Sequence, residues 1–170
     1  MPALDAACQP SIVVVMNDTT DTAGVVVRPP FALGLSVLFG LALDWLLPLP
    51  FLPDRAARWF GGMVLVLAVG LFGGAIATIT RAGSNVPTYR PTITIVESGP
   101  YRFTRNPIYL GMMATLAGLA IVLDNLWLLM MLVPFAIVIR YGVVAREEAY
   151  LERKFGDVYR GYRSRVRRWL

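Results

Sequence analysis

The sequence contains no histidine, and only one of its 170 residues is a cysteine, Cys8. The absence of histidine excludes Ser-His and Cys-His catalysis, histidine metal sites and histidine ligation of haem. A single cysteine can form neither an intramolecular disulfide nor a cysteine-rich metal site. We therefore expect no metal site, and any chemistry must use carboxylates, arginines, tyrosines, amides or a bound cofactor.

Charged side chains are also scarce, at 16% of the residues, whereas 56% of the residues are hydrophobic. A single domain of this size has too little interior for so much apolar side chain, so part of it must face lipid. Nine of the 16 basic residues lie at or after Arg140. This basic tail predicts contact with anionic membrane lipids. Nucleic acid, the other common partner of a basic segment, is not expected for a membrane-spanning chain.

Four apolar segments have lengths that approach or reach the roughly 20 residues of a membrane-spanning helix. They cover about residues 31–51, 59–80, 107–123 and 126–144. The sequence therefore predicts an all-α integral membrane protein with four transmembrane helices, in which residues 29–170 form a single domain. Gly70 and Gly74 form a small-xxx-small pair, which predicts close packing of another helix there, and Ala114 and Gly118 predict a second close-packing face on the third helix. Pro134 is predicted to kink the fourth helix.

The segments between the apolar runs are polar. Residues 1–28 are predicted to be a mobile or surface-lying leader, with Met16 as an alternative start of the chain. Residues 81–106 form a loop rich in arginine, glycine and proline, and residues 145–168 show the apolar spacing of an amphipathic interfacial helix. Arginines concentrate on the side that holds both termini and this loop, so we expect both termini in the cytoplasm, with the helices in the cytoplasmic (inner) membrane.

One candidate site lies in the loop, from Gly99 to Tyr109. Gly99-Pro100 sets a turn, and Arg105 offers a fork of donors that suits a carboxylate. Pro107 holds Asn106 extended and begins the third apolar helix, whose N-terminus attracts anions. The segment predicts either part of a ligand site or a simple turn at which the chain re-enters the membrane.

A second candidate site is Arg146-Glu147-Glu148, just after the fourth apolar segment. Two adjacent carboxylates could bind a cationic or hydroxylated ligand. The alternative is a solvated helix end with pairs between neighbouring turns, which needs no ligand.

Taken together, the two segments resemble a known family. The sequence runs in order through a Gly-Pro-Tyr turn, Arg-x-Pro-x-Tyr at 105–109, two apolar segments, Arg-Glu-Glu, and Phe-Gly-x-x-Tyr at 155–159. This order, over roughly residues 81–168, resembles the isoprenylcysteine carboxyl methyltransferase family and its relatives, the phospholipid N-methyltransferases. The resemblance implies transfer of a methyl group from S-adenosyl-L-methionine, bound at the cytoplasmic face, to a lipophilic small-molecule or lipid acceptor that enters from the bilayer.

The resemblance also implies the site residues. The implied cofactor-binding residues are Gly99, Tyr101, Arg105, Asn106, Pro107, Tyr109, Glu147, Glu148 and Tyr159, and the implied catalytic residues are Arg105, Asn106 and Glu147. Asn106 stands where the family usually has histidine, and since its amide cannot titrate, it retains a positioning role and not a proton-transfer role.

Two other functions remain open from the sequence. One is an NADPH-dependent membrane reductase of the sterol-reductase type, because those enzymes resemble this family in their C-terminal region. The other is a non-enzymatic membrane module whose tail binds lipid or a partner helix.

Overall fold

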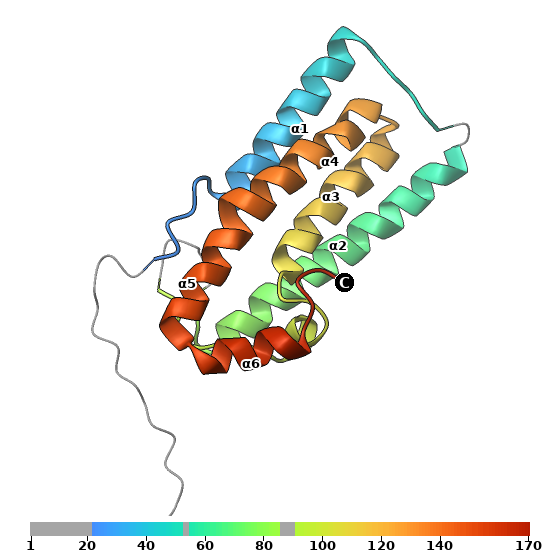
Figure 1. Ribbon diagram of the computed structural model, residues 1–170. Helices are drawn as coiled ribbons and strands as arrows, with labels where there is room; N and C mark the ends of the chain where they lie inside the picture. The colour runs from blue at the N-terminus through green and yellow to red at the C-terminus, as the bar shows by residue number, and fades with distance from the viewer. Residues whose placement is uncertain (1–21, 53–54, 86–90) are drawn as a thin grey trace, which may run out of the picture.

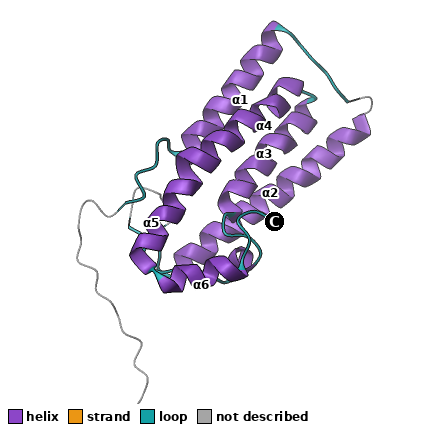
Figure 2. Ribbon diagram, in the orientation of Figure 1, coloured by secondary structure: helices purple, strands orange, loops and turns teal. Residues whose placement is uncertain are grey.

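The computed structural model describes residues 22–52, 55–85 and 91–170, and these ranges contain helices and loops but no strand (Figure 2). The elements in order are α1 Pro29–Leu46, α2 Arg55–Arg81, the short 3₁₀ helix η1 Gly99–Arg102, α3 Pro107–Leu123, α4 Leu126–Ile137, the π-helical segment η2 Val138–Val144, α5 Ala145–Phe155 and α6 Asp157–Arg165. The predicted all-α fold is confirmed.

Each predicted apolar segment contains a helix, but the first helix ends at Leu46 and not at about residue 51, because Pro48 and Pro50 follow. Three helices are long and apolar enough to cross a membrane: Pro29–Leu46, Arg58–Arg81 and the continuous helix Leu126–Phe155. The remaining one, α3, is apolar but shorter, at 17 residues. Large apolar side chains on the outer surface of α2 are exposed, for example Val66 at 72%, as expected for helices that face lipid. The chain is an integral membrane protein.

Pairs of helices lie side by side: α2 lies along α3, and α1 lies along α4 (Figure 1). Glycines allow α2 to approach α3 closely, since a Cβ at Gly118 would lie 2.8 Å from Leu65 Cγ and one at Gly61 would lie 2.7 Å from Ile121 Cγ2. The predicted role of Gly70 and Gly74 is wrong within the described residues. A Cβ at Gly70 would meet nothing within 4 Å, and one at Gly74 would meet only Pro100 Cγ, at 3.8 Å.

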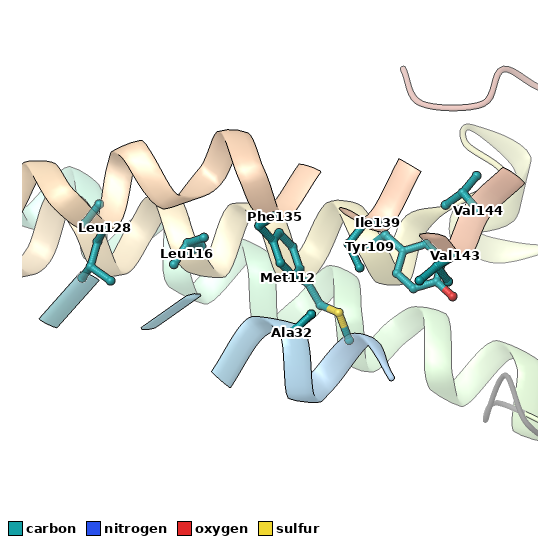
Figure 3. Close-up of a cluster of buried hydrophobic side chains, with 10 residues drawn as sticks. Ala32, Tyr109, Met112, Leu116, Leu128, Phe135, Ile139, Val143 and Val144 are labelled. Carbon is teal, nitrogen blue, oxygen red and sulfur yellow. The ribbon is translucent and has the colours of Figure 1, made fainter. Parts of the chain in front are cut away.

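The main hydrophobic core lies where α1, α3, α4 and η2 meet (Figure 3). Leu116 of α3, Leu128 of α4 and Ile139 of η2 are fully buried there. Tyr109 joins this cluster from the first turn of α3. The core therefore reaches from the middle of the bundle to the end at which the candidate site residues gather.

The turn between α3 and α4 fastens the far end of the bundle. Asp124 adopts a left-handed conformation, with φ 52°, and the Asn125 side chain caps α4 by accepting a hydrogen bond from Leu128 N at 2.9 Å. Asp124 Oδ1 accepts hydrogen bonds from Phe51 N at 2.9 Å and Leu52 N at 2.8 Å. These backbone donors lower the pKa of Asp124. Asp124 and Asn125 thus form the turn between the two apolar helices.

The C-terminal region differs from the single helix predicted over residues 145–168. Helix α5 continues directly from η2, and the chain then bends at Gly156, where φ is 52°. A positive φ strains residues that carry a Cβ, so glycine permits this bend. Beyond it, α6 turns across the end of the bundle (Figure 1), and its Tyr159 and Tyr162 pack with Ile95 of the loop.

The last residues of the predicted leader lie against the helices. Val26 N donates a hydrogen bond to Gly142 O at 3.1 Å, and Arg146 Nη1 donates one to Gly24 O at 2.9 Å. Residues 22–28 therefore run beside η2 and the start of α5. The predicted mobility of residues 1–21 concerns a segment outside the described residues.

Candidate functional site

A pocket lies at the end of the bundle where the loop before α3, the first turn of α3, and helices α5 and α6 come together. Six residues of the predicted site line it: Tyr101, Arg105, Asn106, Pro107, Tyr109 and Glu147. The other three, Gly99, Glu148 and Tyr159, lie behind this lining. The two sequence segments, separated by the α3–α4 hairpin, thus contribute to one pocket.

Gly99 places one wall of the pocket without lining it. Its φ is 59°, and a Cβ there would lie 2.8 Å from Thr78 Oγ1, so glycine lets η1 lie directly on α2. Tyr101 follows in η1 and is buried, and its carbonyl accepts a hydrogen bond from Tyr162 Oη at 2.9 Å. This bond joins the loop to α6.

Glu147 faces the pocket from α5, and its carboxylate is bound by one tyrosine. Tyr109 Oη lies 2.8 Å from Glu147 Oε1 and 2.9 Å from Oε2, so its hydrogen is shared between the two oxygens. Within the described ranges Glu147 forms no ion pair. Glu147 lies in α5, beyond the end of the apolar run at Val144. Burial raises the pKa of Glu147 to about 7, against the lowering effect of the Tyr109 hydrogen bond.

Tyrosines share the pocket with this carboxylate. The pocket is lined by Tyr101, Tyr109, Tyr150 and Tyr162. Burial raises the pKa of Tyr101 and of Tyr162, so both phenols remain neutral at physiological pH. Several tyrosines in one pocket with a carboxylate favour a cationic ligand, because the faces of aromatic rings carry negative charge.

Glu148 has a different environment, although it is the next residue. It is 8% exposed, and its Oε1 lies 3.0 Å from Arg105 Nη1. Arg168 binds the same carboxylate with both Nε, at 3.0 Å, and Nη2, at 2.6 Å. Two arginines therefore bind the Glu148 carboxylate. These ion pairs connect the loop, α5 and the C-terminal segment behind the pocket.

Residues 104–106 hold the C-terminal segment. Arg105 N donates to Arg167 O at 2.9 Å, and Asn106 Nδ2 donates to Arg168 O at 2.9 Å. Thr104 Oγ1 donates to the same Arg168 carbonyl at 3.1 Å. Asn106 thus lines the pocket and also fixes the tail, in keeping with a positioning role.

The Arg105 guanidinium keeps a buried donor from which no described residue accepts a hydrogen bond. Its Nη1 also donates to Tyr159 Oη at 3.3 Å, while its Nε is buried and has no hydrogen-bond partner among the described residues. A buried donor without a partner costs free energy unless a ligand or water accepts from it. Since Arg105 lines the pocket, this donor is a candidate contact for an anionic ligand group.

Sequence reasoning did not identify part of the lining. Thr92, Thr94 and Ile95 come from the middle of the polar loop, where no motif marks them. Their position depends on the path of the loop, since Asn85 Nδ2 donates to Pro91 O at 2.9 Å and returns the chain to the end of α2. Tyr150 was also missed, although its place three residues after Glu147 could have indicated the same helix face.

The described residues contain no group of three or more cysteine, aspartate or glutamate side chains that could hold a metal ion.

Comparison with known proteins identifies the family. Residues 56–158 match the family model for phospholipid methyltransferases. The chain belongs to the phospholipid methyltransferase family. Membership implies a membrane methyltransferase, and the matched region includes α2, the loop, α3, α4 and α5.

One similar protein is an uncharacterized protein of Haemophilus influenzae, which is 43% identical over 63 residues. The aligned region covers 37% of this chain and 100% of that protein. No solved structure matches the chain. Helix α1 lies outside the region that the family model matches.

Proposed function

We propose that this chain transfers the methyl group of S-adenosylmethionine to a lipophilic acceptor at the cytoplasmic membrane face, where the loop and the tail meet. The observation that carries the proposal is the Glu147 carboxylate, which faces a tyrosine-lined pocket and is held by Tyr109 without a cationic partner in the described chain. Membership of a methyltransferase family supports the assignment of the methyl donor to this pocket.

The residues of the pocket fit this cofactor by their chemistry. A sulfonium and an ammonium are both cationic, so they suit the Glu147 carboxylate and the surrounding tyrosine faces. Ribose hydroxyls are donors that a carboxylate can also accept. The buried Arg105 Nε, which has no partner among the described residues, offers a donor for the carboxylate of the cofactor.

The site residues then divide by role. Glu147 contacts the cofactor, and Tyr109 holds its carboxylate in place. Arg105 contacts the cofactor through Nε and binds Glu148 through Nη1. Asn106, Glu148 and Tyr159 act by fixing the tail and the Arg105 side chain behind the pocket.

The bound cofactor supplies a methyl group that its sulfonium has already activated. The chain has to align the acceptor and to exclude water, which is the usual contribution of a protein to such transfers. Tyr101 and Tyr162 are suited to exclusion of water, because their buried phenols close the wall between η1 and α6. The acceptor approaches from the lipid side, where the apolar helices are exposed.

Binding of S-adenosylhomocysteine to the purified full-length protein tests the proposal. We expect binding by titration calorimetry in detergent, and we expect Glu147→Gln to weaken it about tenfold, or about 1.4 kcal/mol, which is typical of one hydrogen bond to a charged group. Glu152→Gln is the matched control, since Glu152 pairs on the surface with Arg163 at 3.0 Å and should leave binding unchanged. Folded protein that does not bind millimolar S-adenosylhomocysteine, or that is stabilised by NADPH instead, would contradict the proposal.

A further inference from the structure

A second hollow lies on the lipid-facing side of the bundle, between α1 and α4. It is a groove of about 580 Å³, to which Ala32, Leu35, Ser36 and Phe39 contribute from α1 and Pro134 and Val138 contribute from the facing helix. Ala32 and Ser36 have small side chains, so the two helices leave space between them. Phe39 is 61% exposed, and the groove is open along its outer side.

The lining of this groove favours a hydrocarbon occupant. Almost all of it is apolar, and the Ser36 hydroxyl already donates to Ala32 O of its own helix at 2.9 Å. A polar occupant would lose its hydrogen bonds to water and gain few in return. Both helices are long and apolar enough to cross the membrane, so the molecules that meet the groove are lipids.

One end of the groove lies next to the candidate cofactor pocket. Val26 lines the groove and is bonded to Gly142 O at 3.1 Å, whereas Ala23, three residues earlier, lines the pocket. Between them, Gly24 O accepts a hydrogen bond from Arg146, the neighbour of Glu147. The short segment 23–27 thus borders both hollows.

We propose that the groove between α1 and α4 holds one hydrocarbon chain of the lipid acceptor while the polar end of that acceptor reaches the pocket at Glu147. This inference rests on the proposed function. The hydrocarbon chain of the acceptor gains little hydrophobic free energy when it leaves the bilayer for the groove, because lipid is as apolar as the groove. The groove therefore orients the acceptor through its shape. Helix α1 lies outside the region matched by the family model, so family membership does not by itself imply this groove.

Photochemical labelling tests the position of the acyl chain. The full-length protein is reconstituted in phosphatidylcholine vesicles with a phosphatidylethanolamine that carries a diazirine in its acyl chain, and labelled peptides are identified by mass spectrometry. We expect label on residues 32–39 and 131–138 that decreases when unlabelled phosphatidylethanolamine is added. Label on the exposed face of α2, near Val66, should not decrease, because it comes from surrounding lipid.

Variants that fill the groove provide the control. Ser36→Phe should abolish the competed label, and the smaller Ser36→Leu should reduce it severalfold. Leu38→Phe adds an aromatic ring to the same helix at a position that is 65% exposed and outside the groove, and it should leave the label unchanged. Retained binding of S-adenosylhomocysteine verifies that each variant is folded.

Three results would overturn the inference. They are uniform label around all helices, label in the groove that phosphatidylethanolamine does not displace, and cross-links that show a second copy of the chain in the groove. If the wild-type protein binds S-adenosylhomocysteine and any of these is found, only the groove is refuted. If S-adenosylhomocysteine does not bind but competed label persists, the proposed methyl transfer fails instead.

Discussion

Two adjacent glutamates of α5 have different contacts because the helix directs them to different neighbours. Glu147 meets Tyr109 at the pocket, whereas Glu148 meets Arg105 and Arg168 behind it. The sequence showed the pair and the resemblance implied a cofactor role for both. The sequence could not show which of the two glutamates faces the pocket, since the partner Arg168 lies 20 residues after Glu148 and reaches it only after the bend at Gly156.

The main effect of Glu148→Gln should be a loss of protein stability, and ligand binding should be affected less. The change leaves the guanidinium of Arg105, which is 9% exposed, without its counter-charge, and breaking such a pair costs about 3 kcal/mol or more. We expect a clear fall in the melting temperature of the purified protein, measured by light scattering or fluorescence. Glu147→Gln should change the melting temperature little in the absence of ligand. Equal melting temperatures for Glu148→Gln and the wild type would contradict this assignment.

The raised pKa of Glu147 predicts how ligand binding depends on pH. The carboxylate binds a cation only when it is ionised, and its pKa of about 7 makes the ionised fraction increase from pH 6 to pH 8. Tyr109, Tyr101 and Glu148 are the titratable groups around it, and burial raises the pKa of Tyr101, so its phenol remains neutral in this range. Affinity for S-adenosylhomocysteine should therefore rise about fivefold to tenfold over this interval. The Glu147→Gln variant should show a flat profile, and an equally steep profile in that variant would assign the titration to another group.

Gly99 and Gly83 offer a matched pair for the close approach of η1 to α2. Both have positive φ, at 59° and 71°, so alanine should cost about 1–2 kcal/mol at each. Gly99→Ala should cost about 1–3 kcal/mol more, because its Cβ would lie 2.8 Å from Thr78 Oγ1, whereas one at Gly83 would meet nothing within 4 Å. Thermal unfolding measures the difference, and the double variant Thr78→Ala, Gly99→Ala should recover part of it. Equal losses at both glycines would show that the contact with Thr78 does not matter.

At the scale of the helices, hydropathy was sufficient to locate all four apolar elements, because lipid exposure leaves long runs without charge. It was only partly sufficient to locate their contacts. Of the small residues that the spacing marked for close packing, Gly118 does meet α2, whereas Gly70 and Gly74 meet no neighbouring transmembrane helix. Gly61, which no motif marked, also makes the close approach between α2 and α3. Spacing alone does not state which face of a lipid-exposed helix meets a neighbour, since both faces are apolar.

Alanine substitutions distinguish these glycines. Gly118→Ala should destabilise the protein by about 1–3 kcal/mol, because its Cβ would lie 2.8 Å from Leu65 Cγ and would push α2 away from α3. Gly70→Ala should be neutral or stabilising by up to about 1 kcal/mol, since alanine favours helix and the position is open. Melting temperatures in one detergent provide the comparison. Destabilisation at Gly70 and not at Gly118 would reverse the packing described above.

The tail shows a similar limit of sequence reasoning. Its apolar spacing predicted a helix correctly, but not the bend at Gly156 that divides α5 from α6. A glycine inside an amphipathic pattern is compatible with a continuous helix, so the pattern alone does not decide. The direction of α6 after the bend depends on the loop, where Ile95 packs with Tyr159 and Tyr162.

At the scale of the whole molecule, the described segments that bear the site gather at one end of the bundle. Residues 22–28, the loop before α3, and α5 and α6 lie at this end, whereas the α1–α2 connection and the α3–α4 turn lie at the other (Figure 1). The arginine distribution predicts that the site end faces the cytoplasm. The sequence could predict this gathering from the number of spans, but the pocket itself required the folded loop.

Cysteine labelling tests the orientation. In a Cys8→Ser background, Leu47→Cys places a thiol at the far end, where Leu47 is 55% exposed, and Ser164→Cys places one on the exposed surface of α6. A membrane-impermeant maleimide added to intact cells should label only Leu47→Cys, and Ser164→Cys should react after permeabilisation. The opposite pattern would place the site on the outer face.

The hydrogen bonds from residues 104–106 to the carbonyls of Arg167 and Arg168 separate two properties of the molecule. All four apolar helices precede these carbonyls in the sequence. A chain truncated before residue 166 would therefore be a membrane protein with a normal set of helices and an unfinished site. Correct membrane insertion and competence to bind a ligand thus depend on different parts of the chain.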